Sequence, residues 1–111
     1  MNIEDKIVKE LKKLIDDLVN KDYAKIAQDG RNGDMPEEVM EEIINDYGGM
    51  ITYPPEDAYS KTDICKIDNA DEYSVIFDLW IDNKRSDLSL MCEAYIDDNE
   101  VTLVIEDIHV L

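Results

Sequence analysis

Seven residues in the last third of the chain combine side chains that suit the recognition of a basic protein. They are carboxylates interspersed with the only tryptophan, a tyrosine and a methionine: Asp78, Trp80, Asp82, Met91, Glu93, Tyr95 and Glu106. Aromatic residues ringed by polar groups often dominate the energy of a protein interface. Carboxylates around such an anchor attract Lys and Arg and speed association. We predict that these seven residues, none of them basic, bind a protein partner.

The side chains that most often catalyse reactions or bind metals form no comparable set. His109 is the only histidine, and it has no cysteine near it in sequence, so a zinc site is not predicted. A general base needs a nucleophile and an orienting partner, and the sequence nominates neither. The acidic residues 97–100 lack the glycine and the distal glutamate of a calcium loop. We expect a protein that is not an enzyme, with no catalytic residue, cofactor or metal ion.

The net charge narrows the class of partner. The chain carries 28 acidic residues against 11 basic ones, a formal net charge of -17. Such a charge repels nucleic-acid phosphates and anionic membrane surfaces, and it attracts basic partners over long range. Residues 34–57 and 87–111 contain no Lys or Arg at all. We therefore expect a basic protein partner, although the same charge also serves solubility alone.

The chain length and the hydropathy pattern favour a single cytoplasmic domain over residues 1–111. A chain of this length can form one hydrophobic core that is stable without disulfides or bound metal ions. The first residues lack the basic and apolar regions of a signal peptide, and no apolar run reaches membrane-spanning length. Cys65 and Cys92 are far apart and lack CxxC spacing, so a disulfide is possible but unsupported.

Three strands must position the seven residues, over residues 73–82, 87–97 and 100–110. In each of them apolar residues alternate with polar ones, which is typical of a half-buried strand. Residues 98–99 form the second turn, which places Glu93 opposite Val104 and Tyr95 opposite Thr102. If residues 83–86 form the first turn, the inward pairs are Ile81 with Leu88, Leu79 with Leu90, and Phe77 with Cys92.

These registers also predict the rows of the opposite face. One row contains Ile76, Glu93 and Val104, and the next contains Asp78, Met91 and Glu106. On the same alternation Ile108 belongs to this outward face, whereas His109 shares the inward face of Ile105. We expect Leu79, Leu90 and Leu103 to be buried beneath the first helix.

Helices are predicted before the strands. Apolar residues recur at helical spacing over residues 3–20, with Asn2 as a candidate cap. A short helix follows over residues 23–28. Asp34 is a candidate cap for a third helix, with Pro36 in its first turn and Gly48 at its end. Short extended segments are expected at residues 50–53 and 64–67, and a polar loop between them. The fold class is α+β, with the helices packed on one face of a curled antiparallel meander.

This order of elements is similar to the NTF2-like, cystatin-like α+β fold. Two local stretches resemble small bacterial NTF2-fold immunity proteins: Asp22-Tyr23-Ala24-Lys25-Ile26 leading to Asp29-Gly30-Arg31, and Ile105-Glu106-Asp107-Ile108-His109-Val110-Leu111. The resemblance implies a cytoplasmic immunity protein that binds one cognate toxin domain, often a nuclease, and blocks its active site or substrate surface. It implies no catalytic residue.

Two alternatives from other classes stay open. The first is an NTF2-like domain that binds a small molecule between helices and sheet, although the inward positions offer few polar side chains. The second is an acidic oligomerising module that buries the face around Trp80 between copies. The sequence does not distinguish a monomer from a homodimer.

Overall fold

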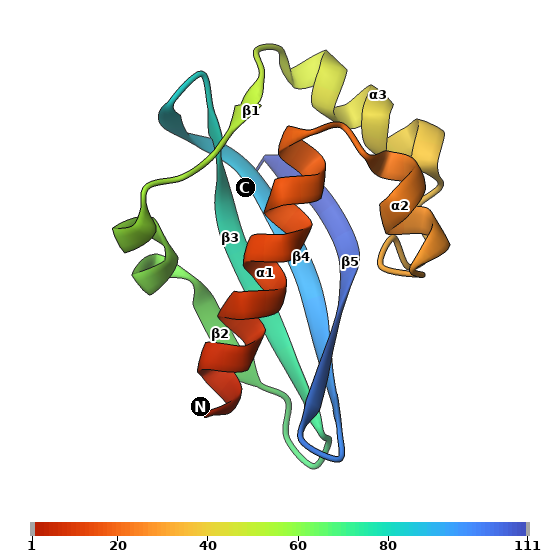
Figure 1. Cartoon of the computed structure of the whole chain (residues 1–111), viewed down its shortest axis with the longest axis vertical. Helices are drawn as coiled ribbons and strands as arrows, with labels where there is room; N and C mark the ends of the chain where they lie inside the picture. Colours follow the sequence, from red (N-terminus) through yellow and green to blue (C-terminus); the bar gives the residue numbers. More distant parts are fainter. Residues whose placement is uncertain (1, 111) are drawn as a thin grey trace.

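A long amphipathic helix lies across an antiparallel sheet in the computed structural model, which describes residues 2–110 (Figure 1). This helix, α1 (Ile3–Val19), begins after Asn2, whose side chain accepts a hydrogen bond from the Asp5 N–H at 2.8 Å. The cap is the predicted one, because an Asn side chain satisfies an N–H that the first helical turn leaves free. The inward stripe of α1 is fully buried: Ile7, Leu11, Leu14, Ile15 and Leu18.

Two shorter helices follow. The predicted bounds of α2 (Tyr23–Gln28) are confirmed, and Asp22 caps it through a hydrogen bond from the Lys25 N–H at 3.3 Å. The third helix, α3 (Glu37–Tyr47), begins after Pro36 and not at the predicted cap Asp34. A helix that began after Asp34 would require a helical conformation of Met35, which the following Pro36 disfavours.

Within residues 2–110 the sheet has five strands, of which three are long. They are β3 (Glu72–Ile81), β4 (Lys84–Asp97) and β5 (Glu100–Val110), paired in chain order. The short strands β1 (Ile51–Thr52) and β2 (Asp63–Lys66) both pair with β3, at different heights of its other edge. Between them the chain forms a 3-10 helix, η1 (Glu56–Lys61), where the sequence predicts a polar loop.

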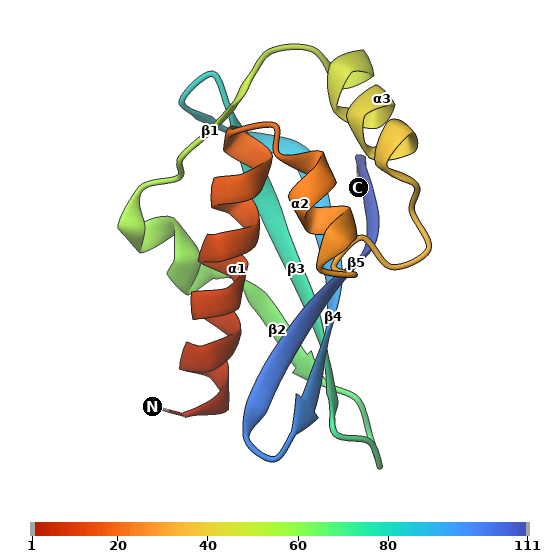
Figure 2. The same cartoon turned by 45° about the vertical axis from the view of Figure 1, so that its right-hand side comes forward.

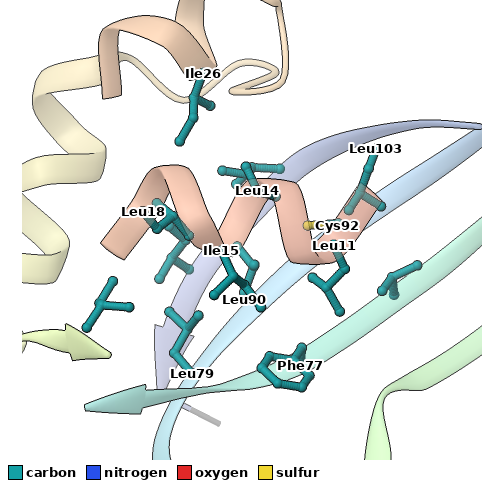
Figure 3. Packing of buried hydrophobic residues seen from close by; sticks show 14 of the residues in the cluster. Leu11, Leu14, Ile15, Leu18, Ile26, Phe77, Leu79, Leu90, Cys92 and Leu103 are labelled. Atoms are coloured by element: carbon teal, nitrogen blue, oxygen red, sulfur yellow. The ribbon is translucent and has the colours of Figure 1, made fainter. Parts of the chain in front are cut away.

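The core lies between α1 and the inner face of the sheet. Leu79, Leu90 and Leu103 are buried there as predicted, and their side chains lie against the apolar stripe of α1 (Figure 3). α1 and α2 lie on the same side of the sheet, and α3 lies near the C-terminal end of β5 (Figure 2). The opposite face, which we call the outer face, is not covered by any helix within residues 2–110.

The register predicted between β3 and β4 is wrong. The turn consists of Asp82 and Asn83 alone, with φ of 51° and 65°, so that Ile81 faces Lys84. Such a turn needs two residues with positive φ, which Asp and Asn tolerate. A β-bulge then places Phe77 opposite Leu90 and not opposite Cys92. Because the shift at Phe77 is an even number of residues, the buried face is nevertheless the predicted one.

The polar side chain of Ser86 stabilises this bulge. Its hydroxyl donates a hydrogen bond to the Leu79 carbonyl at 2.6 Å and accepts one from the Leu88 N–H at 3.1 Å. These hydrogen bonds satisfy backbone groups at the position where the bulge interrupts the hydrogen bonding between the strands.

The register between β4 and β5 is confirmed up to Glu93 and wrong beyond it. Tyr95 faces Thr102 and Glu93 faces Val104, but a second β-bulge follows, and Met91 faces Asp107. One extra residue reverses the alternation. Ile108, predicted on the outward face, is therefore buried at 1% exposure. His109, predicted inward, lies on the outer face opposite Ser89.

The core position of Leu90 gives a direct test of this packing. We expect Leu90→Ala to lower the free energy of unfolding by about 2–5 kcal/mol, because it leaves a cavity beneath α1. Val110→Ala is the matched control on the adjacent strand, since Val110 is 51% exposed, and it should cost less than about 0.5 kcal/mol. Denaturant unfolding measures both, and equal losses would contradict the observed packing.

Candidate protein-binding surface

The two bulges rearrange the rows of the outer face. The observed rows are Ser74–Glu93–Val104, Ile76–Met91–Asp107 and Asp78–Ser89–His109. Of the predicted rows, only the pairing of Glu93 with Val104 is present. The seven predicted residues are therefore divided into groups: Glu93, Tyr95 and Glu106 lie toward one end, Asp78 and Trp80 toward the other, Met91 lies between them, and Asp82 lies at the turn.

Glu93, Tyr95 and Glu106 form what we call the acidic end. The Tyr95 hydroxyl donates to Glu93 Oε2 at 2.5 Å, and this bond raises the pKa of Tyr95 to about 12. Desolvation and the neighbouring Glu93 raise the pKa of Glu106. No Lys or Arg among residues 2–110 forms an ion pair with either carboxylate. The acidic end therefore carries uncompensated negative charge that an external cation would stabilise.

The loop between α2 and α3 adds a third carboxylate to this end. Gly33 and Asp34 line a hollow of about 260 Å³ together with Glu93, Tyr95, Val104, Ile105 and Glu106. Gly33 has a φ of 57°, and a Cβ atom there would lie 2.6 Å from the Ile105 carbonyl oxygen. Only glycine allows this close approach of the loop to β5.

Arg31 fixes that loop. Its Nη2 lies 2.6 Å from Asp17 Oδ2 and 2.8 Å from Asp29 Oδ2, and its carbonyl accepts a hydrogen bond from the Ile105 N–H at 2.7 Å. Asp17 is only 6% exposed, so this pair is largely desolvated. The Asp29-Gly30-Arg31 stretch thus joins α1, the end of α2 and β5. Its role is structural, and it holds Asp34 beside the acidic end.

The other end of the outer face contains a cation that the sequence pattern does not reveal. Arg85, which the sequence predicts in the first turn, lies on β4 opposite Trp80. Its Nε and Nη2 donate to Asp78 Oδ2 at 3.0 and 2.6 Å, and the Ser89 hydroxyl donates to Asp78 Oδ1 at 2.9 Å. Both Asp78 oxygens are therefore occupied, and Asp78 offers little charge to a partner. Trp80 is half-buried beside this pair.

Asp82 has a structural position. Its carboxylate accepts a hydrogen bond from the Met50 N–H at 3.1 Å, and its own N–H donates to the Met50 carbonyl at 2.9 Å. These bonds attach the chain before β1 to the turn between β3 and β4. Asp82 is therefore separate from the acidic end.

The remaining reactive groups do not form a catalytic arrangement in the described chain. His109 Nδ1 lies 2.7 Å from Asp107 Oδ2, but the opposing Ser89 is fully buried and its hydroxyl bonds Asp78. Both cysteines are free thiols: burial raises the pKa of Cys92, and a hydrogen bond to Asp63 raises the pKa of Cys65. Within residues 2–110, no group of three His, Cys, Asp or Glu side chains could hold a metal ion.

Comparison with known proteins places the chain in a family. Residues 15–111 match the model of a domain of unknown function (DUF7668), and the chain belongs to that family. No curated protein and no solved structure matches it. Among the described residues, no helix is long and apolar enough to cross a membrane.

The ion pair between Arg31 and Asp17 can be tested by replacing Arg31 with an uncharged residue. We expect Arg31→Met to cost about 3 kcal/mol of unfolding free energy, because it leaves Asp17 desolvated and without its closest partner. Lys25→Met is the matched control: Lys25 is 57% exposed and its Nζ lies 3.5 Å from Asp17 Oδ1, so its removal should cost less than about 1 kcal/mol. Urea unfolding measures the loss of unfolding free energy in both variants. An equal loss would show that Arg31 does not fix the loop.

Proposed function

We propose that the chain is a cytoplasmic immunity protein that binds a basic toxin domain, of the nuclease class, through the outer face of its sheet. The observation that carries this proposal is the acidic end, where Glu93 and Glu106 have no cationic partner within residues 2–110 although 11 basic residues are present in the chain. The order of three helices and a meander supports the NTF2-like, cystatin-like class as the fold.

Electrostatic complementarity supports the choice of partner. A nuclease needs a basic groove to hold phosphates, and the outer face offers carboxylates to the same Lys and Arg side chains. The net charge of -17 adds long-range attraction to any such groove. An inhibitor that occupies the groove excludes the substrate without any chemistry of its own.

The internal packing favours this proposal over a small-molecule pocket beneath α1. The inner face of the sheet is filled by the apolar stripe of α1, and the inward residues Val75, Leu90 and Cys92 are buried. Polar side chains that could orient a ligand are absent from these positions.

The acidic end is tested against a basic nuclease toxin domain, the class of partner that we propose. We expect Glu93→Gln with Glu106→Gln to slow association about tenfold at low salt, and much less at high salt, because the substitutions remove steering charge. Surface binding kinetics at two salt concentrations measure this effect, and protection of toxin-expressing cells should weaken in parallel.

Glu41→Gln with Glu42→Gln on α3 is the matched control, because it removes the same charge from another surface. We expect its association rate to change by less than about twofold, since this surface lies outside the proposed contact. If the α3 pair abolished binding while the outer-face pair left both rates unchanged, the binding surface would be α3. The mass of the protein in solution shows whether the chain binds to itself. An oligomer that binds no toxin would support the oligomerising module in place of the proposed function.

A further inference from the structure

A cavity opens at a break in the free edge of β3. Thr52 of β1 pairs with Trp80, and Asp63 of β2 pairs with Ile76, so the residues between have no strand partner on this side. η1 lies across the break, and a cavity of about 210 Å³ lies between it and β3. Its position beside Trp80 makes it adjacent to the outer face.

The lining of this cavity suits a flat apolar group. Pro55, Ala58, Phe77 and Trp80 supply an apolar lining, and the Phe77 ring is held by stacking on Tyr59 with 5.3 Å between centroids. Phe77 is 4% exposed and Ala58 is 8% exposed, so these walls are parts of the packed core. A cavity with fixed aromatic walls binds another ring without losing much side-chain freedom.

The charged residues around the cavity balance in number. Arg85 pairs with Asp78, and the remaining charges of the lining, Lys61 and Asp57, have opposite signs. The lining therefore contains equal numbers of acidic and basic side chains, in contrast to the acidic end. A charged ligand gains little here, whereas an uncharged ring gains burial of its apolar surface.

We propose that this cavity receives an aromatic side chain of the same basic partner whose cations meet the acidic end. The inference rests on the proposed function and adds a second contact of different chemistry. Interfaces commonly combine an aromatic side chain in a desolvated pocket with charged contacts outside it. We choose a segment of that partner as the occupant because β3 lines the cavity through Trp80 and pairs with Glu93 through Ser74, so that one extended chain along β3 could contact both sites.

The geometry of β3 sets the spacing between the two contacts. Trp80 lies six residues along β3 from Ser74, which pairs with Glu93. At about 3.3 Å per residue, the distance between the two rows is about 20 Å. A partner segment should therefore present its ring about 20 Å from its Arg or Lys residues.

Synthetic peptides that act as rulers test this spacing on the intact protein. The long aromatic peptide has one phenylalanine, a spacer of six prolines and three arginines, and its spacer separates ring and cations by about 19 Å because polyproline rises about 3.1 Å per residue. The alanine peptide replaces the phenylalanine with alanine and keeps the spacer. The short aromatic peptide keeps the phenylalanine but has only two prolines, a separation of about 6 Å.

Two measurements report on binding of these peptides. Calorimetry gives the affinity of each peptide for the protein. The fluorescence emission of Trp80 reports on the cavity, because Trp80 is the only tryptophan in the chain and lies in the cavity wall.

We expect the long aromatic peptide to bind about tenfold more tightly than either comparison peptide and to shift Trp80 emission. Glu93→Gln with Glu106→Gln should weaken all three peptides, while the affinity ratio of the long aromatic peptide to the alanine peptide stays near about tenfold. Ala58→Leu, which fills the cavity, should bring that ratio to about one. Trp80→Ala provides a second variant with the same expected loss, and circular dichroism confirms that each variant is folded.

The possible results separate the two proposals. Equal affinity for the long aromatic and alanine peptides, or for the two spacer lengths, would overturn the aromatic contact. A loss of affinity on substitution of Glu93 and Glu106 would in that case still support a basic partner. Binding that did not depend on Glu93 and Glu106 would overturn the acidic end as a cation site. Absence of binding by every peptide would contradict both.

Discussion

The apolar stripe of α1 determines which face of the sheet is free. Leu11, Leu14 and Leu18 pack onto the inner face, and burial of this kind is the main favourable term in folding. Because side chains alternate along a strand, covering one face commits every second residue of β3, β4 and β5 to the other. The outer face is thus a consequence of core packing, and its composition is not constrained by the core. The residues of the outer face can therefore suit a binding partner without a change in the core.

Periodicity in the sequence predicts the elements of this fold because burial acts on every second or every third to fourth residue. It predicts α2, β5 and the burial of Leu79, Leu90 and Leu103 for this reason. It does not predict the bulges, since a bulge depends on local bonds such as those of Ser86 and leaves most of the alternation intact. The consequences are concentrated on the outer face, where the two-residue turn brings Arg85 opposite Trp80 and the second bulge turns His109 outward.

The same limit applies to charge. Carboxylates can be counted in the sequence, but which of them have partners cannot be read there. Asp17 and Asp78 are paired with Arg31 and Arg85, whereas Glu93 and Glu106 are not paired within the described residues. Pairing of the first two depends on contacts between separate elements, which alternation does not encode. Among the carboxylates of the outer face, the structure therefore separates Asp78, which is paired, from Glu93 and Glu106, which are not.

The two ends of the outer face can contribute to different steps of binding. Carboxylate charges act over several ångströms, so in the proposed complex Glu93 and Glu106 would affect how often the basic partner arrives in the right orientation. The cavity beside Trp80 acts only on contact, because apolar burial requires that water has already been excluded. In the proposed complex it would therefore affect the dissociation rate. The nuclease inhibitor that we propose would need both properties, since it must bind before the substrate does and must not be displaced by it afterwards. A sheet face with an acidic end and a nearly neutral aromatic cavity about 20 Å away provides them on one rigid element.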